Sequence, residues 1–457
     1  MNFRTNLMKN TLIMTATNLI MRSVAVSFNA YLTSKIGSAG IGLFQLITTV
    51  YSLAVTFSCA GIKLASTRVT VEINSGRKND LRKSMNMFDS YALICGLSVC
   101  LILFLFSDFI SENWICDSNA SYSLKILAFS LPFVAVSASL SGYFTASNLV
   151  IPYSFIQLIE QGTKIITAII LLNQIQNMNV KSACASIVAA ITVSEAVSFS
   201  LSFLLKTLRI DKKTEKAKIE FNRLLRIAIP DAAGTCARSI LLTIEHLLIP
   251  KGFEKSGTGS AAALSAYGNI HAMALPILLY PCAILTSFSS MLIPDLAAKH
   301  ERKDRNAISR TVEKNLKRTL IYSTICAAGL FAFAPIISDL IYKTDEAVLY
   351  IRILAPLIPV MYTDTVTDGM LKGLDQQIQS MRYNIIDSAL CVIMVWFILP
   401  VYSVKGYIFI LYASEIINFY LSIGRLIKIC DIRIFGKIRF SSEFQGDIPT
   451  FLRSTQC

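Results

Sequence analysis

The sequence predicts an all-α polytopic membrane protein with twelve transmembrane helices in two parallel six-helix lobes. Three observations predict this fold class. First, 54% of the 457 residues are apolar, 16% are charged, and the mean hydropathy is +0.56, a balance that excludes an ordinary soluble domain. Second, apolar stretches of about 20 residues, long enough to cross a bilayer as helices, recur along the whole chain. Third, the layout of the chain repeats at an offset of 227 residues, almost half its length.

The internal repeat rests on several matches that share one offset. They are Ser38-Ala39 with Ser265-Ala266, Ile126-Leu127-Ala128 with Ile353-Leu354-Ala355, Pro132 with Pro359, Gly142 with Gly369, Gln157 with Asn384 and Glu160 with Asp387. Two similar apolar halves are typical of transporters built from internal repeats. With six spans each, both halves start and end on one side of the membrane, so the repeats are parallel. We expect an N-terminal lobe at 1–215, a C-terminal lobe at 216–427 and a tail at 428–457.

The twelve expected spans follow the apolar runs in order. In the first lobe they are 10–33, 40–64, 86–107, 122–146, 151–173 and 182–205, and in the second 227–250, 268–292, 317–341, 348–371, 381–401 and 406–427. Helices are expected because these runs are long and do not alternate in polarity as barrel strands do. The first span is too long for a cleaved signal peptide and is expected to remain as an anchor. The polar, basic segment at about 206–226 joins the lobes.

Basic residues set the expected orientation. Lys and Arg crowd the loops after spans 2, 6 and 8, the alternate loops are nearly free of them, and the loop after span 3 is acidic. The basic side faces the cytoplasm, so both termini are expected there, in a bacterial cytoplasmic membrane. The net charge of +14 comes largely from this bias and gives no argument for nucleic acid. The eleven cysteines are scattered without a C-x-x-C pair, and no metal-ligand spacing appears, so neither a metal nor a cofactor is expected.

Polar side chains form stripes inside three spans. In span 2 the stripe is spaced i, i+3, i+4, i+7 and i+11, which places its members on one helix face; they are Gln45, Thr48, Thr49, Ser52 and Thr56. Asn18, Arg22 and Asn29 share a stripe on span 1, and Asp231, Arg238 and Glu245 follow one another at steps of seven on span 7. An ionised group near the bilayer centre costs at least about 2.5 kcal/mol. These faces must therefore pair, snorkel or meet water, and we expect them to line a central cavity.

Several of these residues also admit a purely structural interpretation. Glu160 and Lys164 could form an intrahelical i, i+4 salt bridge, and Asp231 could stabilise the N-terminus of span 7. Arg22, Arg238 and Glu245 could be buried packing pairs, and the span 2 stripe could support helix–helix hydrogen bonds.

Four intramembrane acids are candidates for ion coupling, and for Asp364 and Asp368 a simple water-facing role is the alternative. They are Glu160, the one-turn pair Asp364 and Asp368, and Asp387. Motifs for nucleotide binding, a serine nucleophile, a zinc hydrolase or a dinucleotide turn are absent from the sequence. We therefore expect no enzyme and no ATP-driven step, but transport driven by gradients or membrane potential.

Longer segments carry a family resemblance over about residues 8–425. They are ILAFSLPFVAVSASLSGYFTASN at 126–148, IPYSFIQLIEQ at 151–161, SAYGNIHAMALPILLYPCAILTSFSSMLIPDLAAKH at 265–300 and ILAPLIPVMYTDTVTDGMLKGLDQQ at 353–377. In their order and spacing they resemble the multidrug/oligosaccharidyl-lipid/polysaccharide (MOP) flippase superfamily, in its branch of polysaccharide biosynthesis and stage V sporulation protein B-like proteins. The resemblance implies a V of two six-helix lobes, with a cavity lined by spans 1, 2, 7 and 8. It also implies arginines that bind an anionic headgroup, at positions matched by Arg22 and Arg238. Many relatives have fourteen spans, the last pair forming a lipid groove, whereas this chain has twelve.

The expected function is a flippase that moves a polyprenyl pyrophosphate-linked oligosaccharide or polysaccharide precursor by alternating access. The expected partners are this lipid-linked anionic sugar and membrane lipids, without nucleic acid, and the protein is expected to be a monomer. The proposed binding residues are Arg22, Arg238, Asn18, Asn29, Gln45, Thr49, Ser52 and Glu245. The alternative is an ion-coupled multidrug exporter of the same fold, which Glu245, Asp364 and Asp368 keep open. A membrane-bound polyprenyl-sugar transferase would need an acid or base motif that the sequence does not show.

Overall fold

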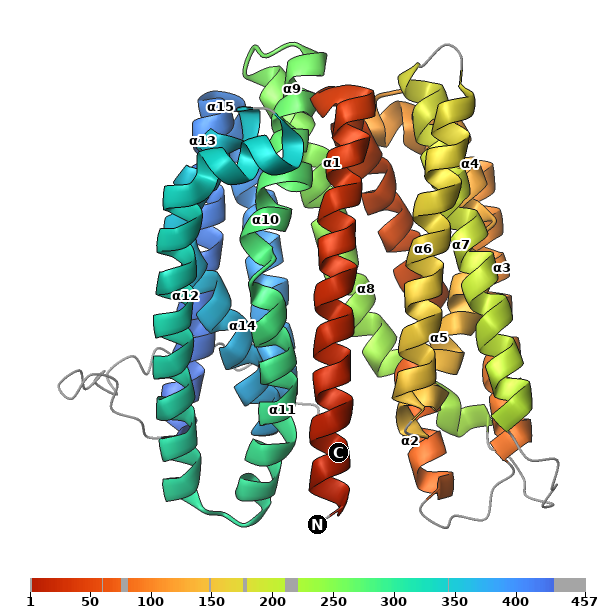
Figure 1. Ribbon diagram of the computed structural model, residues 1–457, viewed down its shortest axis with the longest axis vertical. Helices are drawn as coiled ribbons and strands as arrows, with labels where there is room; N and C mark the ends of the chain where they lie inside the picture. Colours follow the sequence, from red (N-terminus) through yellow and green to blue (C-terminus); the bar gives the residue numbers. More distant parts are fainter. Residues whose placement is uncertain are drawn as a thin grey trace, which may run out of the picture.

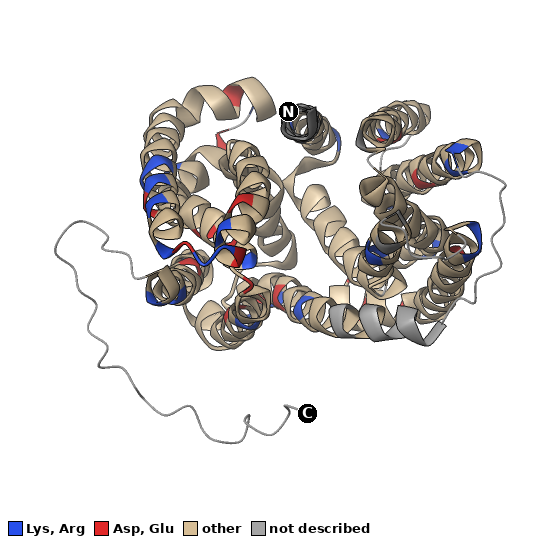
Figure 2. Cartoon of the chain, turned by 90° about the horizontal axis from the view of Figure 1, so that it is seen from below, with Lys and Arg blue, Asp and Glu red and all other residues tan. Residues whose placement is uncertain are grey.

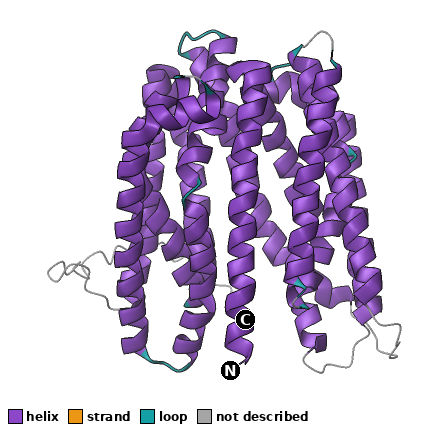
Figure 3. Cartoon of the chain, in the orientation of Figure 1, coloured by secondary structure: helices purple, strands orange, loops and turns teal. Residues whose placement is uncertain are grey.

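The structure is a computed structural model that describes residues 2–59, 61–74, 81–147, 149–175, 179–209, 221–343 and 345–430. Every regular element in these ranges is a helix (Figure 3). The side chains of Asn18 and Asp231, the junction at 210–220 and the predicted tail from 431 onward lie outside the described residues. Residues 428–430, assigned to the tail from the sequence, continue the last helix.

The first half of the chain forms seven α-helices and one π-helical turn. They are α1 (Asn2–Cys59), α2 (Ile62–Asn74), α3 (Leu81–Ile110), η1 (Ser111–Ile115), α4 (Ala120–Ala128), α5 (Leu131–Ala146), α6 (Val150–Gln174) and α7 (Val180–Arg209). Helix α1 is broken at Gly37, whose φ of 71° and ψ of 174° are not helical. Glycine adopts a positive φ without steric cost, so the predicted spans 1 and 2 become the two arms of α1 on either side of this residue.

The second half contains the remaining helices. They are α8 (Phe221–Lys255), α9 (Ser260–Gly268), η2 (Asn269–Ala274), α10 (Leu275–Leu279), α11 (Cys282–Glu301), α12 (Arg305–Tyr342), α13 (Glu346–Leu354), η3 (Ala355–Leu357), α14 (Ile358–Gly373) and α15 (Gln377–Cys430). The predicted span 8 is divided into α9, η2, α10 and α11. Pro281 precedes α11 and offers no N–H to continue a helix through this point. Helix α15 is broken at Ser403, which has a φ of 50°.

The described helices include nine or ten candidate membrane spans. Nine helical segments are long and apolar enough to span a membrane, or ten when α4 and α5, bent by 46°, count as one span. The segments at 19–71 and 377–430 each contain a break, at Gly37 and Ser403. Counting the two arms of each broken segment separately would give the twelve spans expected from the sequence.

The repeat is visible in where the helices break. The bend between α4 and α5 at residues 129–130 corresponds, at an offset of 227, to η3 between α13 and α14. The break at Ser403 corresponds to residue 176, which lies outside the described residues. The shared bend at 129–130 and 355–357 agrees with the internal repeat expected from the sequence, whereas residue 264, which corresponds to Gly37, lies inside α9.

The two halves lie side by side, with the first arm of α1 between them (Figure 1). Helices α3 to α7 pack on one another on one side, and α8, α11, α12, α14 and α15 pack together on the other. We call the end where α1 begins and the α11–α12 turn lies the basal end, and the end that carries the α8–α9 turn the apical end (Figure 1). Large apolar side chains stay exposed on outer helices, including Leu105 at 65%, Leu340 at 78% and Phe397 at 69%. Such surfaces suit lipid rather than water.

The halves meet most closely at the apical end, where the second arm of α1 crosses α9. The hydroxyls of Ser38 and Ser265, which are equivalent in the repeat, lie 2.7 Å apart and share a hydrogen bond. A Cβ at Gly42 would lie 2.2 Å from the Leu264 carbonyl oxygen, and a Cβ at Gly268 would lie 2.4 Å from the Ser38 carbonyl oxygen. Glycine at both positions is therefore what allows the two backbones to approach.

Candidate functional site

A basic pocket lies between the two halves. It encloses about 440 Å³ and is lined by Met21, Arg22, Ala25, Gln161, Lys164 and Thr286. Helices α1 and α6 of the first half and α11 of the second supply these residues. Two of them are cationic, and the described lining contains no carboxylate. The pocket is therefore suited to an anion and touches both halves.

The break between α10 and α11 positions Arg22. Its Nη1 donates a 2.6 Å hydrogen bond to the carbonyl oxygen of Leu279, the last residue of α10. The next residue on α1, Ser23, shares a 2.7 Å hydrogen bond with the Tyr280 hydroxyl. Because a broken helix leaves carbonyl groups without their usual N–H partners, Arg22 can use one here. One N–H of five makes this bond, and the guanidinium still lines the pocket.

Lys164 also faces an acidic pair inside the first half. It attracts Glu160 on its own helix and Glu195 on α7, while the two carboxylates repel each other. Ser198 on α7 also lies near Glu160. Glu160 and Lys164 are thus more than a local i, i+4 pair, because Glu195 adds a second carboxylate for the same ammonium group. Lys164 connects this acidic pair to the basic pocket.

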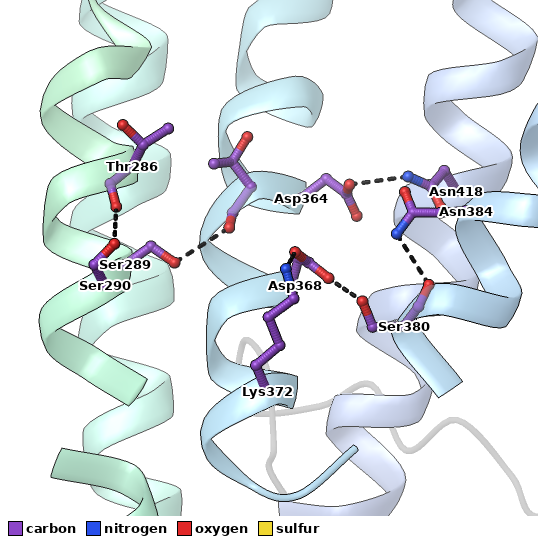
Figure 4. Close-up of polar contacts among 10 residues, drawn as sticks. Thr286, Ser289, Ser290, Asp364, Asp368, Lys372, Ser380, Asn384 and Asn418 are labelled. Carbon is purple, nitrogen blue, oxygen red and sulfur yellow. Dashed lines mark hydrogen bonds and ion pairs between the residues drawn. The ribbon is translucent and has the colours of Figure 1, made fainter. Parts of the chain in front are cut away.

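A larger group of carboxylates lies within the second half. Asp364 on α14 accepts a 3.0 Å hydrogen bond from Asn418 Nδ2, and Asp387 on α15 accepts a 2.7 Å bond from Ser414 (Figure 4 shows the first). Glu415 repels Asp364, Asp387 and Glu245 electrostatically. We call Glu245, Asp364, Asp387 and Glu415 the carboxylate cluster.

Two observations show that the carboxylate cluster is under-compensated. Arg238 on α8 is the cation that attracts Asp364 and Asp387 in the described part of the chain. Asp364 Oδ1 and Asn418 Oδ1 are buried without a hydrogen-bond partner among the described residues. Buried acceptors are normally satisfied, so a proton, cation or water would be stabilised beside them.

Asp368 is in a different situation from Asp364, although it lies one turn away. Its carboxylate pairs with Lys372 Nζ at 2.5 Å and also accepts a hydrogen bond from Ser380 (Figure 4). Its charge is therefore balanced locally, by a residue four positions on in the same helix. The predicted role of Asp368 in ion coupling stays a prediction.

The polar stripe on the second arm of α1 has the exposure expected of a cavity wall. Gln45 and Thr49 are half-buried and Ser52 is exposed, whereas Ile47 and Val50 between them are buried. Thr49 donates its hydroxyl to the Gln45 carbonyl oxygen and lies near Tyr267 on α9, so the stripe also faces the other half.

The other predicted binding residues are dispersed. Asn29 is half-buried on the first arm of α1, and Arg238 is exposed beside the carboxylate cluster rather than in the Arg22 pocket. Glu245 is buried in the cluster. The structure thus brings Arg22 together with Gln161, Lys164 and Thr286, which were not predicted as binding residues.

Sequence reasoning missed Glu195 as well. Its signal was available, because Glu195 is a lone acid near the middle of the apolar run 182–205. The Leu279 carbonyl that holds Arg22 had no such signal, because a backbone acceptor becomes available only through the break at Pro281.

The fold is the multi-pass helical fold seen in solved transporters of the MOP superfamily. The chain is similar to an inward-facing multidrug resistance MATE family transporter of that superfamily, with a TM-score of 0.71 and 12% identity over 91% of this chain and 99% of that one. It is also similar to the lipid II flippase MurJ in an inward closed conformation, with a TM-score of 0.70 and 14% identity over 91% and 87% of the two chains. The predicted fold class is confirmed.

The family is shown by sequence. The family model described as "Polysaccharide biosynthesis protein" matches residues 7–288, and the chain belongs to this family. Stage V sporulation protein B of Bacillus subtilis (strain 168) is 23% identical over 379 residues, which cover 80% of this chain and 73% of that protein. Sporulation protein YkvU of the same strain is 19% identical over 353 residues, covering 74% and 78%. The predicted resemblance is confirmed, and the family contains transporters rather than enzymes.

Proposed function

We propose that the protein is a flippase that moves a polyprenyl pyrophosphate-linked oligosaccharide or polysaccharide precursor across the membrane by alternating access. The observation that carries the proposal is the basic pocket between the halves, in which Arg22 and Lys164 face a cavity without a carboxylate in its described lining. Membership of a polysaccharide biosynthesis family and likeness to a lipid II flippase support it.

The chemistry of the pocket suits a pyrophosphate. The planar guanidinium of Arg22 can donate two parallel hydrogen bonds to phosphate oxygens, and Lys164 adds a compact charge. Keeping these cations within the membrane is costly unless they meet counter-charge or water. The half-buried stripe of Gln45 and Thr49, with Ser52, would accept sugar hydroxyls.

The position of the pocket would couple binding to motion. Because its walls come from α1, α6 and α11, a bound pyrophosphate would be held by both halves at once. Such a ligand shifts the equilibrium between arrangements of the halves only if it binds one of them more tightly. The arrangement in which the pocket walls close around the anion would bind it more tightly, which supplies the required difference in affinity.

The acids would supply ion coupling. An anion that draws Lys164 into the pocket removes the countercharge of Glu160 and Glu195, which then favour a proton or cation. The carboxylate cluster, including the predicted Asp364 and Asp387, offers a second such place within the other half.

The membrane orientation and the oligomeric state of the protein are part of the same proposal. Figure 2 shows Lys and Arg side by side with other residues at the basal end. Five basic residues lie on or near the α11–α12 turn there: Lys299, Lys303, Arg305, Arg310 and Lys314. By the positive-inside rule this end faces the cytoplasm of a bacterial cell. We also propose that one lobe ends at residue 215 and the other begins at 216, that both termini lie in the cytoplasm, and that the protein is a monomer.

A second candidate is an ion-coupled multidrug exporter. The carboxylate cluster favours it, because four acids beside Arg238 could attract a cationic drug. Growth of expressing cells on cationic dyes separates the two: a flippase should give no resistance, whereas an exporter should.

The direct test is transfer of a fluorescent polyprenyl pyrophosphate-linked sugar between leaflets of proteoliposomes. Arg22→Gln and Lys164→Gln should each slow transfer at least tenfold. Arg318→Gln, at an exposed basic residue of α12, is the matched control and should transfer at the wild-type rate. Wild-type transfer by both pocket variants would overturn the proposed function.

A further inference from the structure

A second basic cavity lies at the basal end of the second half, apart from the Arg22 pocket. It encloses about 780 Å³ where α11 ends, α12 begins and α15 ends. Its basic side chains arrive from three elements: His300 from α11, Lys303 and Arg305 from the turn and the start of α12, and Lys428 from the last turns of α15. Residues more than 100 positions apart thus converge on one cavity.

The cavity is amphipathic. Its four basic side chains are exposed and line the opening, whereas Ile308, Leu374 and Cys430 are 6%, 1% and 7% exposed. The described lining includes no Asp or Glu. An apolar floor beneath a basic rim is the arrangement that suits a phosphate joined to an alkyl or glycerol group.

One acid of the turn, Asp304, is already engaged. Asp304 caps α12, and its Oδ1 accepts a 3.0 Å hydrogen bond from the Ala307 backbone N–H. Lys303 takes a positive φ of 55° in the tight turn between α11 and α12, a conformation that is uncommon for a residue other than glycine. The turn therefore holds Lys303 at the cavity while Asp304 stabilises the helix.

We propose that this cavity binds the phosphate group of an anionic ligand at the membrane surface. The three like charges of Lys303, Arg305 and Lys428 around one opening repel each other and are stabilised together by an anion. The source is either the headgroup of an anionic lipid or a soluble phosphate, because both present the same oxygens. A bound phosphate would bridge the α11–α12 turn and the end of α15 and would stabilise the basal end of the second half.

This inference does not depend on the proposed function. The positive-inside bias alone puts Lys and Arg at the basal end, but it does not direct them into a cavity with an apolar floor. The discriminating comparison is between basic residues that line the cavity and an equal number that do not.

The test uses the full chain in phosphatidylcholine nanodiscs. The cavity variant is Lys303→Gln/Arg305→Gln/Lys428→Gln, and the control Arg310→Gln/Lys314→Gln/Lys317→Gln removes the same charge from exposed positions of α12 outside the cavity lining. Lys303→Gln alone serves if the triple variant does not fold. The probes are phosphatidylglycerol added to the nanodisc and, separately, soluble pyrophosphate; the readouts are the thermal unfolding midpoint and lipid retention in native mass spectrometry.

Wild type and control should be stabilised by at least about 2 °C by phosphatidylglycerol, pyrophosphate or both, and the cavity variant should lose most of that shift. A response to phosphatidylglycerol alone identifies a lipid headgroup, and a response to pyrophosphate identifies a soluble phosphate. The shift should survive Arg22→Gln, which removes the other basic pocket. No response in wild type, equal loss in the control, or loss in Arg22→Gln alone would overturn the inference.

Discussion

The Arg22 pocket and the carboxylate cluster are opposite in charge and in position. The pocket places Arg22 and Lys164 between the halves, and its arginine bonds a backbone carbonyl of the other half. The cluster lies within the second half, and its bonds, such as that from Asn418 to Asp364, stay inside that half. An anion bound in the Arg22 pocket therefore contacts both halves and depends on how they are arranged, whereas a cation bound in the carboxylate cluster contacts a single half.

The repeat shows how this difference arose from similar halves. Glu160 and Asp387 occupy equivalent positions, so each half keeps a carboxylate there. Lys164, however, corresponds to Cys391, which is 5% exposed. One substitution thus gives the first half an ammonium group beside its acids and leaves the second half without it. The two acidic groups should accordingly respond differently to an anion.

Reversing the charge of the pocket is expected to have the largest effect. Arg22→Glu should reduce lipid-linked sugar transfer at least about 100-fold, since it loses the Leu279 bond and repels the pyrophosphate. Arg238→Glu, beside the carboxylate cluster, should reduce transfer less and should mainly alter its dependence on ion gradients. The measurement is transfer in proteoliposomes with imposed gradients. If Arg22→Glu and Arg238→Glu change the transfer rate and its dependence on ion gradients equally, the two regions do not differ in function.

Filling the apical crossing should come next. Gly42→Ala places a Cβ 2.2 Å from the Leu264 carbonyl oxygen, so the α1–α9 contact must shift at a cost of about 1–3 kcal/mol. Spin labels at positions 34 and 254 should report a wider distance distribution. Gly329→Ala is the matched control, because nothing lies within 4 Å of its added Cβ. A distribution that does not widen in Gly42→Ala would show that the halves need no close backbone contact there.

Neutralising the cluster should have a smaller effect that separates ion coupling from substrate binding. Asp364→Asn and Asp387→Asn should each slow gradient-driven transfer about tenfold, or about 1.4 kcal/mol, while substrate affinity changes less than twofold. The exposed Asp375→Asn is the control. If affinity falls as far as it does in Arg22→Gln, the cluster belongs to the substrate site instead.

Local patterns predicted the fold well, and long-range contacts limited what could be predicted of the site. The spans and the stripe of Gln45, Thr49 and Ser52 follow from hydropathy and helical spacing, which depend on neighbours in sequence. The depth of Arg22 in span 1 marked it as costly, so the sequence proposed it as a binding residue. Its partners depend on how α6, α10 and α11 pack and on a break at Pro281, which one sequence does not encode in a readable pattern. Lys164 was visible but assigned to its i, i+4 neighbour, because Glu195 lies 31 positions farther on.

The smallest expected effect concerns the pair of serines that the repeat makes equivalent. Ser38 and Ser265 share a 2.7 Å hydrogen bond at the apical crossing. A neutral hydrogen bond contributes about 0.5–1.5 kcal/mol, so Ser38→Ala and Ser265→Ala should each shift the population of the closed apical arrangement severalfold. The double variant should be little worse than either single one, since both remove the same bond. The same spin-label distance, between positions 34 and 254, is measured in the two single variants and the double variant. Additive effects would mean that each hydroxyl acts on its own helix, and the crossing would then rest on the glycine contacts rather than on this bond.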